Sequence, residues 1–320
     1  MYVYVLFVLG FVFLIKGASW LVAGVASLAK KLRMSNLLIG LTVLAIGTSL
    51  PELIINLFAT INSKPEVAFG NIIGSNLSNT LLVLGIVALL VQFNIQQGTI
   101  RRELPFMFLS IVVLIALVND KIIDQGINTL SRVDGLILLC FFSIFVYYVF
   151  LLAKGSRVQL EEKEVDVKTH KGTSIATLIV AGIVFISLGG QWVVNGAVAL
   201  ARVMGFSEFF ISATIVAIGT SLPELTATIV AALKQDINLA IGNVIGSNIY
   251  NIFFVLGITA VVKPLNIAGS YNFDLGFLLA TAFLLFIFMF TGKKNVLDRG
   301  EGISFLALYA IYIIILVIRG

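Results

Sequence analysis

A nine-residue stretch that occurs twice places a carboxylate inside an apolar segment. Residues 45–53 read Ala-Ile-Gly-Thr-Ser-Leu-Pro-Glu-Leu, and residues 217–225 repeat the same letters. Apolar residues flank each copy for more than a helical turn, so Glu52 and Glu224 are expected where water is scarce. Ionisable groups at membrane depth are costly and usually mark functional sites. This duplicated glutamate constrains the chain more than any other feature of the sequence.

The composition excludes an ordinary soluble globule. Hydrophobic residues make up 59% of the 320 residues and charged residues only 12%, which is typical of a polytopic membrane protein. One cysteine and one histidine, His170, nearly exclude disulfide frameworks, cysteine metal sites and imidazole catalysis. The net charge of +5 is interpreted as a positive-inside bias, and no nucleic-acid partner is expected. Because the chain turns apolar at once without a basic region, we expect no cleaved signal peptide.

Ten apolar segments are long enough to cross about 30 Å of hydrocarbon. They are 2–29, 36–62, 66–92, 103–119, 133–153, 174–201, 208–233, 238–262, 274–291 and 303–318. The predicted fold is therefore an all-α, multi-pass membrane protein of ten transmembrane helices, numbered here in that order.

The ten segments form two sets of five that match at a constant offset of 172, which is 224 minus 52. Residues 70–76 (Gly-Asn-Ile-Ile-Gly-Ser-Asn) correspond to residues 242–248 (Gly-Asn-Val-Ile-Gly-Ser-Asn). Because five is odd, the second copy must enter the membrane from the opposite face, which gives repeats of inverted topology. We predict a first repeat over 1–153, a cytoplasmic linker over 154–173 and an inverted second repeat over 174–320.

The distribution of basic residues predicts the orientation. Connections after helices 1, 3, 5, 7 and 9 contain 14 Lys and Arg, whereas the other side contains 6. The positive-inside rule then places both termini outside, the linker in the cytoplasm and the protein in the cell membrane. The lipid bilayer is its expected surrounding, and no feature calls for an obligatory protein partner.

Helices 2 and 7 are expected to break at the repeated stretch. Pro51 lacks an N–H and its ring clashes with the preceding turn, while Gly47 weakens the same turn. Carbonyl groups near Ala45 and Gly47 are then freed, and in a membrane only protein groups, water or an ion can satisfy them. Near each break, side-chain hydroxyl and carboxylate oxygens can serve as ion ligands together with these carbonyl oxygens. The resulting candidate donors are Ala45, Thr48, Ser49, Glu52, Ala217, Thr220, Ser221 and Glu224.

Helices 3 and 8 are expected to complete the pocket. Ser75 and Asn79 are four residues apart and share one helix face, as do Ser247 and Asn251. Glycines at spacing four allow close helix approach, and that role is at least as well supported as a ligand role: Gly70, Gly74, Gly242 and Gly246. For four further asparagines a ligand role and a structural role stay equally open: Asn71, Asn76, Asn243 and Asn248.

The predicted donors are all oxygens, which favour hard cations such as Ca²⁺ and Na⁺ over zinc or copper. No lysine or arginine lies in the motif-bearing segments, and Lys16 in helix 1 is the one candidate partner for the two glutamates. We therefore interpret Glu52 and Glu224 as ligands of transported cations, without any prosthetic group.

The motifs Gly-Thr-Ser-Leu-Pro-Glu and Gly-Asn-(Ile/Val)-Ile-Gly-Ser-Asn, each present twice in inverted five-helix repeats, resemble those of the sodium/calcium exchanger family. The likeness covers nearly the whole chain and is closest to compact prokaryotic members. It implies four central ion sites between helices 2, 3, 7 and 8. Calcium would bind Glu52 and Glu224 with the main chain of Thr48 and Thr220. Sodium would use the remaining donors: Ser49, Ser75, Ser221, Ser247 and the carbonyls of Ala45 and Ala217.

The resemblance also implies a movement of two helices, and this chain departs from some relatives at one position. Helices 1 and 6 would slide across the core to expose it alternately to each side. Some relatives, including potassium-dependent ones, carry aspartate where this chain has Asn251, which argues weakly against potassium coupling. Two carboxylates neutralise one Ca²⁺ or two Na⁺, so a third Na⁺ would bind as excess charge or at a neutral site. Exclusive occupancy by one kind of ion is then expected, because leftover charge is costly in a low-dielectric site.

The leading interpretation is an antiporter in which Na⁺ enters and Ca²⁺ leaves. A rival on the same fold exchanges H⁺ for Ca²⁺, with Glu52 and Glu224 carrying the protons. A cation channel needs a continuous pore, which inverted repeats with broken helices disfavour. An intramembrane hydrolase built on Ser49 or Ser221 lacks a basic partner in the membrane, so enzymatic activity is not expected.

Overall fold

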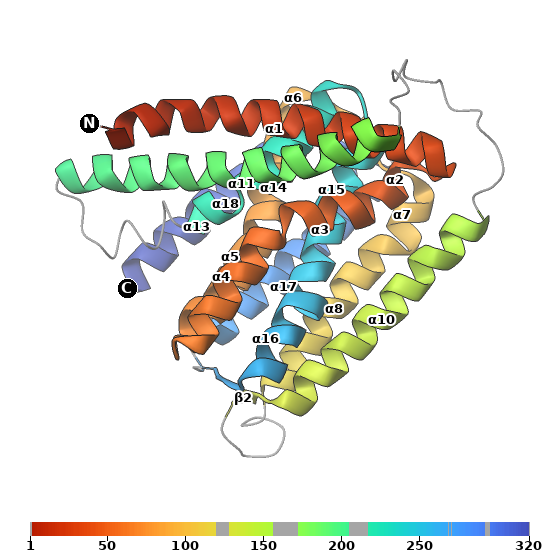
Figure 1. Cartoon of the computed structure of the whole chain (residues 1–320). Coiled ribbons are helices and arrows are strands. Elements are labelled where there is room, and N and C mark those ends of the chain that lie inside the picture. The colour runs from red at the N-terminus through yellow and green to blue at the C-terminus, as the bar shows by residue number, and fades with distance from the viewer. Residues whose placement is uncertain are drawn as a thin grey trace.

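The computed structural model describes residues 2–119, 128–155, 172–204, 217–267, 269, 271–291 and 295–319. Its elements are almost entirely helical (Figure 1). In the first repeat they are α1 (Tyr2–Leu32), α2 (Asn36–Ile39), η1 (Gly40–Leu44), α3 (Ala45–Thr48), α4 (Leu50–Ile61), α5 (Pro65–Leu77), η2 (Ser78–Val83), α6 (Leu84–Leu90), β1 (Phe93–Asn94), α7 (Gln97–Arg101), α8 (Glu103–Val118), β2 (Thr129–Leu130) and α10 (Arg132–Gly155).

The second repeat follows the same order of elements where it is described. It contains α11 (Gly172–Val203), α13 (Ala217–Thr220), α14 (Leu222–Leu233), α15 (Ile237–Ile249), η4 (Tyr250–Leu256), α16 (Gly257–Val262), β3 (Leu265–Asn266), α17 (Tyr271–Phe288), β4 (Val296–Leu297) and α18 (Arg299–Arg319). The η segments are stretches of π-helix inside otherwise α-helical spans.

Two helical spans form the centre of the molecule. The span α5–η2–α6 has 78% of its most apolar stretch buried inside the protein, and α15–η4–α16 has 83%. The corresponding values are 33% for α1 and 28% for α11, which leave much of their surface to the surroundings. The motif-bearing spans are therefore packed by protein on nearly all sides, whereas α1 and α11 lie at the periphery.

Helices α1 and α11 lie side by side and run in opposite directions along one face of the molecule (Figure 1). Glycines make this close approach possible, because a Cβ added at Gly17 would lie 2.7 Å from the backbone nitrogen of Ile186. The rings of Phe13 and Phe185 stack with their centroids 4.4 Å apart. The two equivalent helices therefore form one antiparallel pair.

Contacts between the repeats come in matched pairs. Strand β1 pairs with β4, and β2 pairs with β3, so each short sheet joins one repeat to the other. Gly85 of α6 lies against Gly302 of α18, and Gly135 of α10 lies against Gly257 of α16. If each element is replaced by its counterpart in the other repeat, the β1–β4 pair becomes the β3–β2 pair, and the α6–α18 contact becomes the α16–α10 contact.

The structure confirms that the chain is an all-helical protein with several apolar spans. Among the described residues, seven helices are long and apolar enough to cross a membrane, or eight when the bent pair Asn36–Thr48 and Leu50–Ile61 counts as one span. Helix α8 has 16 residues and α14 has 12, so neither reaches a full span by itself. Part of the predicted span 208–233 and most of the predicted linker lie outside the described residues. The count of ten spans stays a prediction.

Candidate cation site

The predicted break in the second span occurs at Ser49. The axes of the two helical parts differ by 43°, and Ser49 has φ −87° and ψ 4° between α3 and α4. Pro51 occupies the first turn of α4, where its missing N–H costs no hydrogen bond. Ser221 has nearly the same conformation, φ −90° and ψ 6°, before α14. Both glutamates thus lie in the first turn of a helix, where the N-terminal dipole favours negative charge.

Both glutamate side chains are fully buried, with no exposed surface. Ser49 Oγ donates a hydrogen bond of 3.1 Å to Glu224 Oε1, which joins the break of the first repeat to the carboxylate of the second. Glu224 Oε2 and both carboxylate oxygens of Glu52 have no hydrogen-bond partner among the described residues. Glu52 and Glu224 lie close enough for their negative charges to repel each other. A buried carboxylate without partners is strongly disfavoured unless a cation or a proton compensates it.

No protein cation compensates this pair in the described part of the chain. Lys16 is exposed on α1 and forms no ion pair with either glutamate. Carboxylate ion pairs do form on other helices, where Arg102 pairs with Glu103 and Arg319 with Asp274. Groups of three or more His, Cys, Asp or Glu side chains are also absent from the described residues, so a site rich in nitrogen, sulfur or carboxylate ligands is not formed there.

Thr48 connects the break to the central helix α15. Its hydroxyl lies 3.3 Å from Asn243 Oδ1 and 3.4 Å from Ser247 Oγ. The glycine-rich sequence of α15 allows this contact, because Gly246 leaves no room for a side chain against Leu41 and Ala45. The structure thus brings Thr48, Ser49, Glu224 and Ser247 together.

The carbonyl of Ala45 is not free, which corrects the prediction for this group. It accepts hydrogen bonds from Ser49 N at 3.0 Å and from Thr48 Oγ1 at 3.3 Å. The helix therefore stays hydrogen-bonded through Ser49. A carbonyl oxygen has two lone pairs, and the two protein donors together can occupy both lone pairs of the Ala45 oxygen.

Asparagines brace the two central spans against each other. Asn76 Nδ2 donates to the carbonyl of Asn248 at 3.2 Å, and Asn79 Nδ2 donates to Asn248 Oδ1 at 3.1 Å. In the mirrored contact, Asn251 Nδ2 donates to Asn76 Oδ1 at 3.0 Å. Asn248 also donates to Thr80 Oγ1 at 2.9 Å. Asn76 and Asn248, whose role the sequence leaves open, thus make cross-repeat hydrogen bonds.

Several predicted donors keep unpaired oxygens. The oxygens that are buried and have no hydrogen-bond partner among the described residues are Asn79 Oδ1, Asn251 Oδ1, Ser75 Oγ and Ser221 Oγ. Thr220 is half-buried at the end of α13, and Ala217 begins that helix, although its side chain lies outside the described residues. The network therefore provides protein acceptors for the asparagine amide nitrogens but leaves these side-chain oxygens available.

A second pair of polar contacts was not expected from the sequence. Asn71 Nδ2 donates to Asn56 Oδ1 at 2.8 Å, and Asn243 Nδ2 donates to Thr228 Oγ1 at 2.9 Å. Asn56 and Thr228 each follow the glutamate by four residues, which places them on the same helix face. The spacing of four residues from the glutamate is the sequence signal from which both residues could have been predicted to lie near the site.

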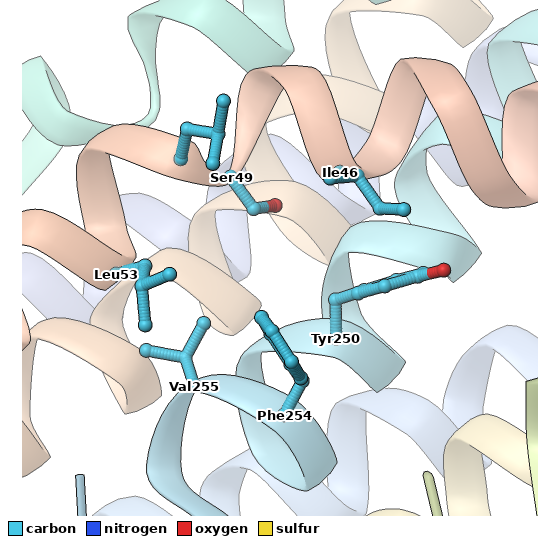
Figure 2. Close-up of a pocket in the computed structure, with 7 residues that line it drawn as sticks. Ile46, Ser49, Leu53, Tyr250, Phe254 and Val255 are labelled. Carbon is cyan, nitrogen blue, oxygen red and sulfur yellow. The ribbon is translucent and has the colours of Figure 1, made fainter. Parts of the chain in front are cut away.

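A small pocket lies beside the break of the second span (Figure 2). Ile46, Ser49 and Leu53 line it on one side, and Tyr250, Phe254 and Val255 of η4 line it on the other. Its volume of about 10 Å³ is the space of roughly one water molecule. Ser49 therefore lies between this mostly apolar pocket and Glu224.

Comparison with known proteins agrees with this arrangement. The family model described as "Sodium/calcium exchanger protein" matches residues 2–151 and 174–318. The sodium/calcium exchanger MaX1 of Methanosarcina acetivorans is 30% identical, with 98% of each chain covered. The Ca²⁺/H⁺ antiporter ChaA of Bacillus subtilis is 25% identical, with 81% of this chain and 78% of that protein covered.

The solved structures include a similar fold. The sodium-calcium exchanger NCX_Mj matches with a TM-score of 0.81 at 31% identity, and the match covers 97% of each chain. The family model spans nearly the whole chain, and both motif-bearing regions lie inside it. The chain therefore belongs to the sodium/calcium exchanger family.

Proposed function

We propose that this protein is a secondary antiporter that exchanges Na⁺ for Ca²⁺ at a site near the middle of the membrane. The observation that carries the proposal is the pair of buried glutamates, Glu52 and Glu224, three of whose four carboxylate oxygens have no partner among the described residues. A hard cation compensates such a pair, and oxygen donors surround it. The names of MaX1 and NCX_Mj support sodium and calcium as the exchanged ions.

The proposed ion ligands share one property, which is an oxygen at the junction of the broken helices and the central spans. They are Glu52, Glu224, Thr48, Thr220, Ser49, Ser221, Ser75, Ser247, Asn79, Asn251, Ala45 and Ala217. The two glutamates and the main chain of Thr48 and Thr220 would hold calcium. Because the Ala45 carbonyl already accepts two hydrogen bonds, sodium binding there requires at least one of them to lengthen.

Charge balance supports competition as the basis of exchange. Two carboxylates neutralise one Ca²⁺ or two Na⁺, and the described residues add no protein cation at the site. Binding Ca²⁺ together with Na⁺ would leave positive charge in a low-dielectric interior, which is costly. The site would therefore hold calcium or sodium, but not both.

Ten spans in two inverted repeats are the topology that we propose for this exchange. The antiparallel pairing of α1 with α11 and the exchanged sheet pairs support it, because inversion makes equivalent helices run oppositely. The repeats would be residues 1–153 and 174–320, joined by a cytoplasmic linker over 154–173. The bias of basic residues favours both termini outside, in a cell membrane.

Alternating access is the proposed transport mechanism. Helices α1 and α11 pack mainly on each other through glycines and stacked aromatic rings, so they can move as a pair over the central spans. Extracellular ion exchange and induced occlusion of the binding site are described for NCX_Mj. The same cycle would expose Glu52 and Glu224 to one side at a time. Neither a prosthetic group nor an enzymatic step is part of this mechanism.

Proton coupling is the second candidate, because ChaA is named a Ca²⁺/H⁺ antiporter. Calcium flux into reconstituted liposomes loaded with Na⁺, K⁺ or acid in turn separates the two. We expect an outward Na⁺ gradient to drive calcium uptake, and a pH gradient or a K⁺ gradient to drive little. If calcium uptake follows the pH gradient and does not depend on Na⁺, the ion exchanged for Ca²⁺ is H⁺ and not Na⁺.

Replacing Ser49 by alanine is expected to weaken ion binding by about tenfold, because a hydrogen bond to a charged group contributes about 1.5–3 kcal/mol. The change removes the donor to Glu224 and a proposed sodium ligand. The measurement is the half-saturating Na⁺ and Ca²⁺ concentration for exchange. Ser110→Ala is the control, because Ser110 is equally buried but bonds to the carbonyl of Met107 in its own helix. Equal affinities in both variants would contradict the role of Ser49.

A further inference from the structure

A line of buried polar side chains follows one face of α4. Glu52, Asn56 and Thr60 are spaced by four residues, so they lie above one another on this face. Their exposed fractions are 0%, 0% and 1%. Each has at least one polar atom without a hydrogen-bond partner among the described residues, namely both oxygens of Glu52, Nδ2 of Asn56 and Oγ1 of Thr60. Three consecutive helical turns thus carry unsatisfied polar groups on the same face.

This line connects the candidate cation site to the end of the helix. Helix α4 has 12 residues, which is about 18 Å of helix. It starts at the break, next to the two glutamates, and ends at Ile61, where the exposed turn 62–64 begins. The polar face therefore leads from Glu52 to the membrane face that contains this turn.

The second repeat lacks the outer part of this line. The residues that correspond to Glu52, Asn56 and Thr60 at the offset of 172 are Glu224, Thr228 and Ala232. The Thr228 hydroxyl is satisfied by Asn243 Nδ2, and Ala232 is a fully buried methyl group. The repeats thus share the carboxylate but differ in the two turns that follow it.

Unsatisfied groups in this position require an explanation. Buried amides and hydroxyls are almost always hydrogen-bonded, to protein or to ordered water. Asn71 donates to Asn56 Oδ1, but both amide hydrogens of Asn56 are still without an acceptor among the described residues. Water is the natural partner for a row of small polar groups at one-turn spacing, and water near Glu52 is also what an arriving cation brings.

We propose that Asn56 and Thr60 form a hydrated transit site, where a transported Na⁺ or Ca²⁺ keeps part of its water between Glu52 and the membrane face of the 62–64 turn. This inference rests on the proposed function. It makes the two routes to the site unequal. The route along α4 is polar, whereas the matching face of α14 ends in an alanine.

Cysteine accessibility tests the water in this track directly. The single native cysteine, Cys140, is exposed on α10 and is first replaced in a Cys140→Ser background. Thr60→Cys, Ala232→Cys and Ile61→Cys are then treated with a water-soluble, membrane-impermeant cationic thiosulfonate from each face of oriented vesicles. We expect Thr60→Cys to react about tenfold faster than either control, and only from the face of the 62–64 turn, because the reagent requires aqueous access. Ile61, which is 64% exposed on the outer surface of α4, reports reaction at the lipid side.

Transport measured from each face is the second readout. We expect Thr60→Val and Asn56→Leu to raise the half-saturating Ca²⁺ concentration on the face of the 62–64 turn by about fivefold, with no change on the opposite face. A purely structural role would change both faces or lower the amount of folded protein.

The outcomes separate this inference from the proposed function. A Thr60→Cys protein that exchanges ions but reacts no faster than Ile61→Cys would overturn the transit site alone. If Thr60→Cys and Ala232→Cys are modified at equal rates, each from the membrane face at its end of the helix, the proposed difference between the routes along α4 and α14 is wrong. If the native chain shows no Na⁺-driven flux while Thr60→Cys reacts selectively, exchange of Na⁺ for Ca²⁺ is wrong and the water-accessible track on α4 is supported.

Discussion

Calcium transport is expected to disappear when either Glu52 or Glu224 is replaced by glutamine. The substitution keeps the shape of the side chain but removes half of the negative charge that would balance Ca²⁺. A unit charge about 4 Å from a carboxylate is attracted by roughly 4 kcal/mol at an effective dielectric constant of about 20, and Ca²⁺ carries two charges, so the affinity should fall by at least about a thousandfold. Both variants should still fold, because removing one charge also relieves the repulsion between the two buried carboxylates.

Radiolabelled calcium uptake into Na⁺-loaded liposomes measures this effect, with the yield of monodisperse protein as the test of folding. Glu103→Gln is the matched control, because Glu103 is also a fully buried glutamate in an apolar helix. It accepts a hydrogen bond from Tyr148 and lies on α8, outside the candidate site. We expect this variant to retain transport. Normal uptake by a folded Glu52→Gln protein would remove the glutamate from the ion site.

Replacing Gly242 by alanine is expected to produce a large loss of stability. A Cβ at this position would lie 2.5 Å from the carbonyl oxygen of Leu37 and 3.0 Å from the backbone nitrogen of Leu41. Backbone atoms cannot move aside without separating α15 from α2 and η1. Overpacking of this kind costs about 1–3 kcal/mol, which exceeds the gain of about 1 kcal/mol from replacing a helical glycine.

Thermal unfolding in detergent measures this loss, and we expect the apparent melting temperature to fall by about 5 °C. The control is Gly276→Ala in α17. Gly276 is exposed, and no described atom lies within 4 Å of an added Cβ there. Gly276→Ala should therefore be neutral or slightly stabilising. A stable Gly242→Ala protein would show that α15 does not need this close approach.

The breaks and the close helix contacts could be predicted because they depend on local chemistry. Pro51 removes a backbone donor wherever it stands, and the structure bends the second span by 43° beside it. The spacing of the glycines in α15 predicts close approach, and Gly242 and Gly246 do contact the backbone of the segment 37–41.

The π-helical stretches could not be predicted. Segments η1, η2 and η4 follow no sequence signal that we identified, although each lies in a span that carries a repeated motif. Such insertions depend on which neighbours hold the extra backbone groups, and those neighbours come from distant parts of the chain. The expected free carbonyl at Ala45 was wrong for a local reason, because Ser49 N donates the ordinary helical hydrogen bond to it and the Thr48 hydroxyl donates a second one.

The sequence by itself determined the family, the repeat and the identity of the two glutamates. These follow from composition, from a constant offset and from an acidic residue placed after a proline, and none of them depends on which helices touch. Only the tertiary structure decided that Ser49 of one repeat hydrogen-bonds Glu224 of the other, that Asn76 and Asn248 brace the central spans, and that the polar face of α4 has no equal on α14. Those facts arise from contacts between residues more than 150 positions apart or from the loss of water on burial, which no local pattern encodes.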